Sequence, residues 1–311
     1  MNHIEIVPRG PFSWAAAVDF LGGFAPTRHH VPATRDVIRI TFPLDATFTP
    51  VAVALHEDHG SVMGEVAGAT DRAAVQRQVE RIFSLDVDGR AYPEVGKRDP
   101  DIGRLMEQLP GLRPVQFTSP YECACWGIIS QRIHHLQAAK VKEWLISEYG
   151  TPIDVAGETV RCFPTPEQML GVNEIPALNP AKAERLRGVA RAALEGKLDV
   201  GRLRGMGMDA AISALHTLPG IGDFWSLGIY LRACGYHDVF PPEPISIRAL
   251  AALKGLPAVP KGDELERLVE PYRPFRMWVC VLLRVAAGHG FIPGEDGQQH
   301  RESRSGMRAR R

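Results

Sequence analysis

The sequence lacks an apolar run long enough to cross a bilayer, and its first ten residues do not show the charged-then-apolar order of a signal peptide. Cysteine is scarce, odd in number and scattered, with residues Cys123, Cys125, Cys162, Cys234 and Cys280. This usage excludes a disulfide framework and a four-thiolate metal site, so we expect all five thiols to be small core residues. These absences predict a cytoplasmic protein with no membrane partner.

The chain also lacks a net charge, because its 36 Lys and Arg residues balance its 36 Asp and Glu residues. A strongly basic chain would favour a nucleic-acid partner. A neutral chain neither favours nor excludes a nucleic-acid partner, because binding depends on whether positive charges cluster on one face. The marked cluster lies in the tail, residues 291–311, where five arginines follow one another closely: Arg301, Arg304, Arg308, Arg310 and Arg311. We expect a disordered tail, with a weak phosphate contact as its functional alternative.

Residues 1–90 combine short strands with few helices, which predicts a small antiparallel sheet with helices on one side. We expect strands at 4–7, 36–42, 51–55 and 61–67, and helices at 14–21 and 70–83. Ile38, Ile40 and Phe42 alternate with more polar residues. That alternation predicts a strand with one buried face and one face in water.

The polar, turn-rich segment 86–101 separates this unit from the rest, and we place a linker at 91–101. Beyond it, residues 102–290 predict a helical domain without a convincing strand. Three helix starts carry a capping residue followed by proline, at Ser119, Thr165 and Asn179. We expect the first of these helices to run through Trp126, Ile129, Ile133 and Leu136. Further helices are expected at 140–149, 181–194, 245–253, 262–269 and 274–288.

The stretch Leu218-Pro219-Gly220-Ile221-Gly222 stands between two helical patterns. Two glycines around one apolar residue allow a tight reversal, and Ile221 can fill the space between the helices. The amides of the turn and of the next helix's first residues then point outward without partners, which makes a site for an anion such as a DNA phosphate. A glycine-rich turn that only packs two helices together is the structural alternative.

Further stretches occur in order along nearly the whole chain, at residues 11–14 (PFSW), 120–122 (PYE), 128–131 (IISQ), 163–167 (FPTPE), 182–186 (KAERL), 238–240 (DVF) and 274–276 (PFR). With the hairpin, they resemble the helix-hairpin-helix DNA glycosylases of the DNA-3-methyladenine glycosylase II type. The resemblance implies an α+β fold, with a small antiparallel-sheet domain before a two-lobed helical domain. It also implies a monofunctional enzyme that excises alkylated purines from double-stranded DNA in base excision repair. Nothing in the sequence indicates an obligate oligomer, so we expect a monomer.

Removal of a base from a duplex needs a side chain that fills the gap left behind. The positions that match the family's wedge are Gln131 and Arg132. The family often has an apolar residue there, so Arg132 is a departure, although a long side chain can still occupy the gap. Two polar residues on a solvated helix face are the structural alternative.

The second requirement is a pocket of aromatic faces, since a positively charged alkylpurine is attracted to each ring by about 1–2 kcal/mol. The resemblance implies Phe20, Phe224, Gly228 and Phe275 as pocket positions. Where the family tends to have tryptophan, this chain has Phe224 and Phe275, and Gly228 removes a ring. The adjacent rings of Trp225, Tyr230 and Trp278 either complete the pocket or belong to the core, and we include Trp225 in the predicted pocket.

The third requirement is an ionised carboxylate beneath the sugar, which acquires oxocarbenium character. The resemblance places an aspartate three residues beyond Pro241, where this chain has Pro244. Pro244 suits the first position of a helix and puts Glu243 near the N-cap, where the helix dipole stabilises a carboxylate. We therefore predict Glu243 as the catalytic carboxylate, with Asp223 a helix cap and Asp238 a turn residue.

Two further absences narrow the activity. Bifunctional relatives carry a lysine two residues past the hairpin's last glycine, where this chain has Phe224, so a strand-cleaving lyase is not expected. No cysteine follows Cys280, which excludes the cluster of the iron–sulfur branch. The family implies a monovalent cation on the hairpin carbonyls, and we expect no other cofactor. Because Pro244 replaces the expected aspartate and the pocket is thinned, a catalytically inactive damaged-DNA-binding protein is the alternative; an unrelated helical protein with a chance hairpin is a third.

Overall fold

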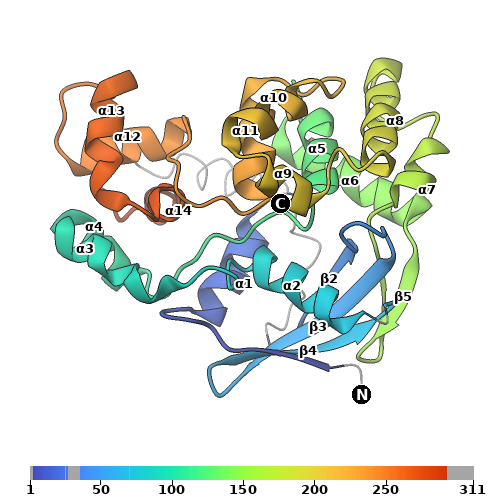
Figure 1. The fold of residues 1–311 in the computed structure, drawn as a ribbon, viewed down its shortest axis with the longest axis horizontal. Coiled ribbons are helices and arrows are strands. Elements are labelled where there is room, and N and C mark those ends of the chain that lie inside the picture. The colour runs from blue at the N-terminus through green and yellow to red at the C-terminus, as the bar shows by residue number, and fades with distance from the viewer. Residues whose placement is uncertain (1–2, 25, 27–35, 70, 293–311) are drawn as a thin grey trace, which may run out of the picture. The chain divides into compact units, whose positions relative to one another are not determined.

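The computed structural model describes residues 3–24, 26, 36–69 and 71–292 (Figure 1). Contacts between residues divide the chain into two compact units. The first comprises Met1–Arg9, Ala17–Val87 and Val115–Tyr236, and the second comprises Gly10–Ala16, Asp88–Pro114 and His237–Arg311. These two units do not coincide with the domains and linker expected from the sequence, and the expected domain bounds stay a prediction. The arginine cluster of the tail lies outside the described residues.

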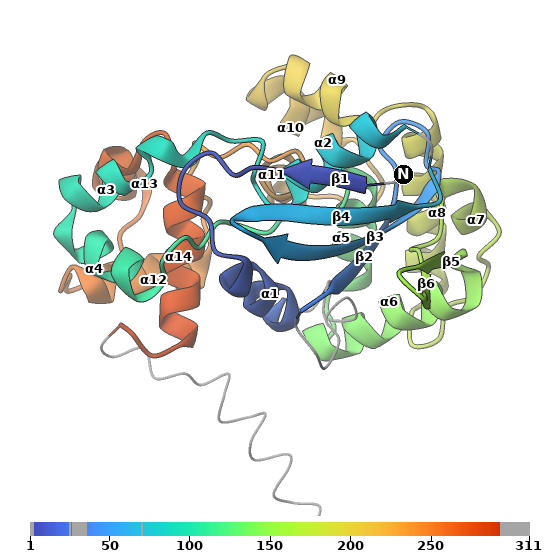
Figure 2. The same ribbon diagram turned by 90° about the horizontal axis from the view of Figure 1, so that it is seen from below.

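Four antiparallel strands form the sheet of the first unit: β1 (His3–Ile6), β2 (Ile38–Pro43), β3 (Pro50–Asp58) and β4 (Ser61–Ala67). They lie side by side in the order β1-β4-β3-β2 (Figure 2). Ile4 pairs with Gly64, and Ile40 pairs with Val53. All four strands occur where the sequence predicts them. Helices α1 (Trp14–Gly23) and α2 (Arg72–Ile82) were also predicted, and Asp71 caps α2 by accepting from the Ala74 N–H.

A second, two-stranded sheet contradicts the prediction of no strand beyond residue 101. Strands β5 (Pro152–Val155) and β6 (Glu158–Arg161) form a short hairpin. Each strand has only four residues, too few for alternation to give a clear signal. Val155 packs with Ala52 and Ala54 of β3 in one core cluster, so the hairpin covers a face of the first sheet.

This hairpin also corrects the expectation that β2 has one face in water. The Thr41 hydroxyl donates to the Arg161 carbonyl oxygen at 3.0 Å, and the Arg39 guanidinium donates to the Ala156 carbonyl oxygen at 3.1 Å. Thr41 is consequently buried. The polar residues of β2 alternate as expected, but they bond to backbone groups of a distant segment instead of water.

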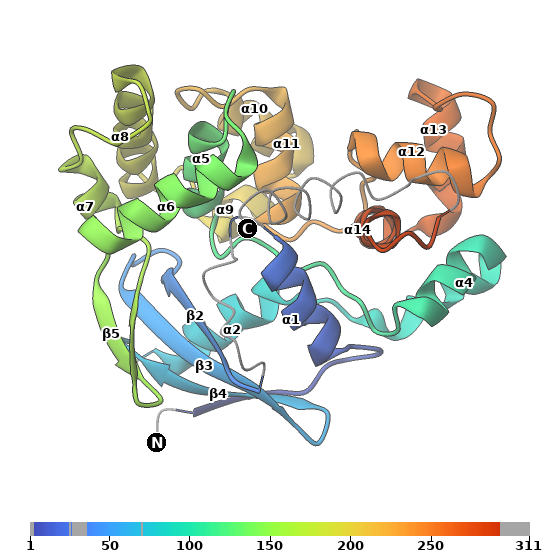
Figure 3. The same cartoon turned by 180° about the vertical axis from the view of Figure 1, so that it is seen from behind.

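Besides α2 and most of α1, the first unit contains α5 (Pro120–Ile129), α6 (His135–Tyr149), α7 (Pro166–Leu170), α8 (Pro180–Leu194), α9 (Val200–Gly205), α10 (Met208–His216) and α11 (Asp223–Arg232) (Figure 3). The predicted caps Ser119, Thr165 and Asn179 each accept a hydrogen bond from the N–H three residues on. Thr165 forms a complete capping box with Gln168. The sequence Ser119-Pro120-Tyr121-Glu122 predicts a second capping box, but this box is incomplete, because the buried Glu122 carboxylate accepts from Thr118 and Lys142 instead.

The helix predicted to run from Ser119 through Leu136 is in fact two helices. Helix α5 ends at Ile129, and α6 begins at His135. Between them Arg132 has a φ of 56°, a left-handed conformation that cannot continue a right-handed helix. Ile133 and Leu136 therefore do not lie on α5, and Leu136 is exposed. We call residues 130–134 the wedge turn.

The second unit contains α3 (Pro93–Arg98), α4 (Pro100–Gln108), α12 (Pro244–Leu253), α13 (Gly262–Val269) and α14 (Arg276–Gly288). The segment expected as a linker thus carries α3 and the start of α4. These two helices approach closely, since a Cβ added to Gly96 would lie 2.9 Å from the Gly103 Cα. Trp278 of α14 is fully buried, with the Arg113 guanidinium carbon 5.0 Å from its ring centre.

The five cysteines are all buried, as predicted. Among the residues that the structure describes, no helix is both long and apolar enough to span a membrane.

Candidate functional site

The predicted hairpin joins α10 to α11 in the first unit. Leu218 and Ile221 are buried, so they hold the two helices together as expected. Gly220 has a φ of 82°, which favours glycine. Within the described residues, the backbone N–H groups of Gly220, Gly222, Asp223 and Phe224 have no acceptor. The last three stand at the N-terminus of α11, where unpaired amides and the helix dipole favour an anion.

The two hairpin glycines differ in what surrounds them. A Cβ added to Gly220 would lie 2.7 Å from the Cδ of Arg185, so packing and backbone conformation both require glycine there. Gly222 has a φ of −102°, and a Cβ added there would meet nothing within 4 Å. Nothing inside the described protein therefore requires glycine at 222. Bare backbone in open space lets an external group approach the amides closely.

The wedge turn is attached to the hairpin and to α8. The Gln131 side-chain amide donates to the Gly220 carbonyl oxygen at 2.7 Å. The Lys182 ammonium donates to the carbonyl oxygens of Ile129 at 2.9 Å and Gln131 at 2.6 Å. Burial lowers the pKa of Lys182, and the nearby positive charge of Arg185 lowers it further. The structure thus bonds Gln131 to the predicted phosphate-binding Gly220, and Arg132 follows Gln131 in the same turn.

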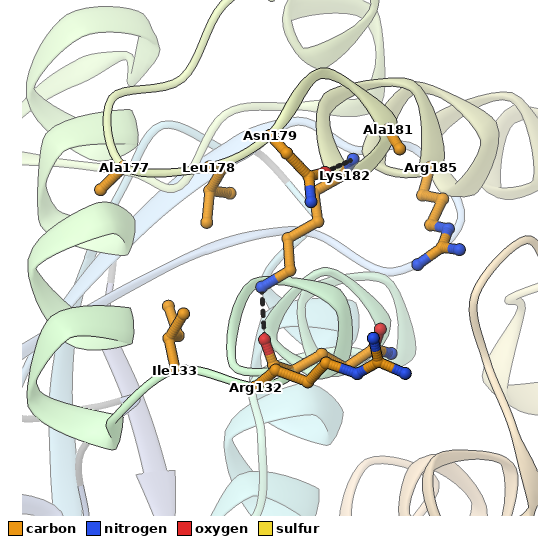
Figure 4. Close-up of a pocket in the computed structure, with 9 residues that line it drawn as sticks. Arg132, Ile133, Ala177, Leu178, Asn179, Ala181, Lys182 and Arg185 are labelled. Carbon is orange, nitrogen blue, oxygen red and sulfur yellow. Dashed lines mark hydrogen bonds between the residues drawn. The ribbon is translucent and has the colours of Figure 1, made fainter.

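An open cavity of about 510 Å³ lies beside the wedge turn (Figure 4). It is lined by Gln131, Arg132, Ile133, Ala177, Leu178, Asn179, Ala181, Lys182 and Arg185. Three of these side chains are cationic and none is acidic. Arg132 and Arg185 are exposed, and in Figure 4 both guanidinium groups lie on the side of the view away from Ile133. In the described part of the chain neither forms a hydrogen bond or ion pair, so both are free to meet an anion.

Lys182 and Arg185 line this cavity, although the sequence did not predict them as site residues. One local feature of the sequence could have identified Lys182. Lys182 stands in the first turn of α8, where the helix dipole disfavours a cation. Such a lysine indicates a partner outside its own helix.

The predicted base-pocket residues of the first unit do not all meet. Phe224 is 60% exposed and lies edge-on to Trp225, with ring centres 5.4 Å apart. Trp225 lies close to Gly228 of its own helix and to Gly127 of α5, where an added Cβ would be 2.9 Å from its ring. Phe20 instead contacts Phe24 and the Arg232 guanidinium, the latter 5.7 Å from its ring centre. No ring contact within the described residues joins Phe20 to Phe224.

Phe275, the remaining pocket candidate, belongs to the second unit and is buried. Its ring packs 5.2 Å from Tyr92, 5.0 Å from Trp278 and 6.0 Å from His237, measured between ring centres. These contacts give Phe275 and Trp278 a core role, and Tyr230 is buried in the first unit. The assignment of Phe275 to a base pocket stays a prediction.

Glu243 caps α12 in the second unit, and Pro244 occupies the first helical position, as predicted. One carboxylate oxygen accepts from the Ser246 N–H and hydroxyl, both at 2.7 Å. The other accepts from the Arg284 guanidinium at 2.6 Å. The helix terminus and Arg284 therefore stabilise a negative charge on a side chain that is 20% exposed.

The two alternative carboxylates have other partners. Asp238 pairs with Arg273 at 2.7 Å and with Arg276 at 2.9 Å. The prediction that Asp223 caps α11 is wrong, since the N-cap is Gly222, and Asp223 lies 3.2 Å from the His216 ring nitrogen.

No described group of three His, Cys, Asp or Glu side chains is arranged to hold a metal ion. The predicted cation on the hairpin carbonyls stays a prediction. Two of those carbonyls already accept hydrogen bonds, Leu218 from the Ile221 N–H and Gly220 from Gln131.

No family model matches the chain. The DNA-3-methyladenine glycosylase of Bacillus subtilis (strain 168) is 23% identical over 217 residues, which are 68% of this chain and 72% of that protein. DNA-3-methyladenine glycosylase 2 of Escherichia coli (strain K12) is 31% identical over 198 residues, which are 62% of this chain and 66% of that protein.

A solved structure, the 3-methyladenine DNA-glycosylase from Archaeoglobus fulgidus, matches with a TM-score of 0.74 and 22% identity. The match covers 91% of this chain and 97% of that one. It confirms the fold class, a four-stranded antiparallel N-terminal sheet followed by a largely helical domain.

Proposed function

Because the chain is a relative of the DNA-3-methyladenine glycosylases of the helix-hairpin-helix superfamily, we propose that it binds duplex DNA and excises alkylated purine bases in base excision repair. The observation that carries the proposal is the hairpin. Its backbone N–H groups lack acceptors among the described residues, and Gly222 leaves room for a phosphate to approach them. Bound phosphate accepts from these amides at the positive end of the α11 dipole.

The wedge turn supplies the next step of the proposal. Gln131 is bonded to the hairpin carbonyl of Gly220, so a strand held by the hairpin lies close to Arg132. The exposed, unpaired Arg132 side chain then enters the gap that an extruded nucleotide leaves in the duplex. Arg185, which packs against Gly220, adds positive charge beside the phosphate.

The chemistry requires recognition of the base and stabilisation of the sugar. The exposed Phe224 ring, with Trp225 beside it and the small Gly228, offers a π-face to a cationic alkylpurine. Phe20 in the first unit and Phe275 in the second remain proposed base-binding residues. The Glu243 carboxylate is proposed to stabilise the positive charge that develops on the sugar as the glycosidic bond breaks.

One observation favours a second function, a damaged-DNA-binding protein without turnover. Both oxygens of Glu243 are engaged within the protein, one by Ser246 and the other by Arg284. A carboxylate occupied in this way stabilises the helix start and is less available to a sugar cation. The proposed replacement of the family's aspartate by Pro244 points in the same direction.

Binding is tested with Gly222→Ala, and Gly205→Ala is the matched control. Neither glycine has a positive φ, and an added Cβ meets nothing within 4 Å at either position. We expect Gly222→Ala to keep the melting temperature and to weaken duplex binding by about ten-fold, or 1.4 kcal/mol. Gly205→Ala should leave the affinity unchanged. An unaltered affinity in a folded Gly222→Ala protein overturns the phosphate-binding proposal.

Turnover is tested by single-turnover release of base from a duplex that contains methylated adenine. Base release that is lost in Glu243→Gln supports the enzyme with Glu243 as its carboxylate. The control Arg284→Met removes the ion pair but keeps the carboxylate, and it should retain release. Tight binding without release supports the second function, and release that survives in Glu243→Gln removes Glu243 from the mechanism.

A further inference from the structure

Lys182 is a buried cation whose location its own helix does not explain. Its side chain is 7% exposed, and it stands in the first turn of α8, capped by Asn179. A positive charge there opposes the helix dipole, which is unfavourable. Burial of an ammonium group adds a further cost, which an apolar side chain of similar length would avoid.

The partners of Lys182 are carbonyl oxygens at the end of α5 and in the wedge turn that follows it. Helix α5 ends at Ile129 with Ser130 as its C-cap, so its last carbonyls have no helical donor. The Lys182 ammonium donates to the Ile129 oxygen at 2.9 Å and to the Gln131 oxygen at 2.6 Å. Figure 4 shows its side chain extending from α8 down to this turn. Lys182 thus bonds to the backbone directly before Arg132.

Arg132 needs such support, because its left-handed backbone is unfavourable for a residue with a side chain. A non-glycine residue in this region is strained, and such a conformation persists only where the surroundings fix it. Lys182 holds the Gln131 carbonyl, and Gly220 holds the Gln131 side chain. The peptide before Arg132 is therefore fixed on both sides.

We propose that Lys182 is a positioning residue that presets the wedge turn, so that Arg132 faces the duplex before an alkylated nucleotide is extruded. The inference rests on the proposed function, because it uses the wedge role of Arg132. Lys182 acts through Arg132 and contacts no substrate atom in this scheme. Its contribution is preorganisation: without it, part of the binding free energy is consumed in ordering the turn.

The experiment compares the full-length wild type with Lys182→Met on a duplex that carries 2-aminopurine, a fluorescent adenine analogue, next to an alkylated base. Fluorescence at saturating protein reports unstacking, and a separate salt titration reports phosphate contacts. We expect Lys182→Met to bind within about three-fold of wild type while the fluorescence rise falls at least two-fold. The slope of log K against log[salt] should not change, whereas loss of a direct phosphate contact would lower it by about one.

A double-mutant cycle separates positioning from a general loss of stability. Arg132→Ala should give the same loss of fluorescence, and adding Lys182→Met to it should cause no further loss, because the two act in series. Lys182→Arg retains donors for the two carbonyls and should restore part of the signal. Thr165→Ala removes a helix cap elsewhere in the first unit, and it should lower the melting temperature without changing the fluorescence rise.

The outcomes distinguish this inference from the proposed function. If wild type and Lys182→Met give the same fluorescence rise, or if the effects of Lys182→Met and Arg132→Ala are additive, the positioning role is wrong while the proposed function stands. If wild type does not bind the duplex, both fail. Should Lys182→Met not fold, Lys182→Arg in the wild-type and Arg132→Ala backgrounds gives the same cycle with a smaller expected effect.

Discussion

At the scale of single residues, the structure separates side chains that fill the core from those that remain for a ligand. Phe275 is buried among other rings, whereas Phe224 presents a large aromatic face to solvent directly after the hairpin. Glu243 combines a helix cap with an ion pair to Arg284. Residues of the same chemical type therefore differ in what they can offer to DNA.

Phe224→Ala tests the exposed ring. Because the side chain is 60% exposed, its removal should change the melting temperature little. Loss of one cation–π contact of about 1–2 kcal/mol predicts a five- to thirty-fold slower release of a methylated, cationic base. Phe291→Ala is the control, since that phenylalanine is also exposed and has no role in the proposed site. Equal release rates in both variants would assign Phe224 no role in the pocket.

Glu243→Ala tests the cap and the ion pair together. Removal of a side-chain cap lowers the free energy of unfolding by roughly 0.5–2 kcal/mol, so the melting temperature should fall by several degrees. Arg284→Met should cost less, since a partly exposed ion pair contributes little. A Glu243→Ala melting curve identical to wild type would show that the cap does not stabilise α12, and the engaged carboxylate would then no longer favour the binding-only function.

At the scale of elements, helix ends position the candidate functional groups within each of the two units. The N-terminus of α11 offers its amides, the C-terminus of α5 offers carbonyls to Lys182, and the N-terminus of α12 holds Glu243. Helix ends carry the unpaired backbone groups of a protein, so ligands and buried charges gather there. The second unit has a similar link between helix ends: Lys254, the residue directly after α12, donates to Asp99 and Asp101 at the N-terminus of α4.

That link gives a prediction about pH. Lys254 donates to Asp101 at 2.7 Å, and this hydrogen bond is the main cause that lowers the pKa of Asp101 below 3.8. A carboxyl whose pKa is lower in the folded state than in the unfolded state stabilises the protein at pH values above its unfolded-state pKa of 3.8. That stabilisation is lost as the pH falls from 3.8 through the lower pKa of the folded state. In Lys254→Met, the melting temperature should therefore fall less between pH 5 and pH 3 than in wild type, and an equal fall would contradict the link.

At the scale of the whole molecule, the proposed functional residues are divided between the two units. The hairpin, wedge turn and Phe224 belong to the first, and Glu243 and Phe275 belong to the second. In the proposed function, DNA binding depends on residues of the first unit, whereas base release also depends on residues of the second, so variants of the second unit should lose turnover while they keep binding.

DNA binding also predicts a change in global stability. A ligand that binds only the folded state stabilises it by about 2.7 kcal/mol at one hundred times its dissociation constant. We expect a duplex to raise the melting temperature by several degrees, less at higher salt because counterion release drives binding. Gly222→Ala should show a smaller rise at the same duplex concentration. If the rise is absent in wild type at low salt, duplex DNA is not the partner.

Local sequence signals determined most of the elements and the hairpin. Strand alternation, the caps at Asp71, Thr165 and Asn179, and the two glycines around Ile221 act through neighbours a few residues away. Helix and turn formation depend on such short-range groups, so the sequence alone suffices to place them. The sequence also predicts Glu243 and Pro244 at the start of a helix, because the preferences of both residues for these positions are local.

Only the tertiary structure decided what joins distant segments. Thr41 and Arg161 are joined by a hydrogen bond although they lie 120 positions apart in the sequence. This contact buries the face of β2 that was predicted to face solvent. Lys182 and Gln131 are 51 positions apart, and their contact fixes the wedge turn where periodicity predicted an unbroken helix. Partners so far apart leave no local pattern, because the chain must fold before either side chain reaches the other.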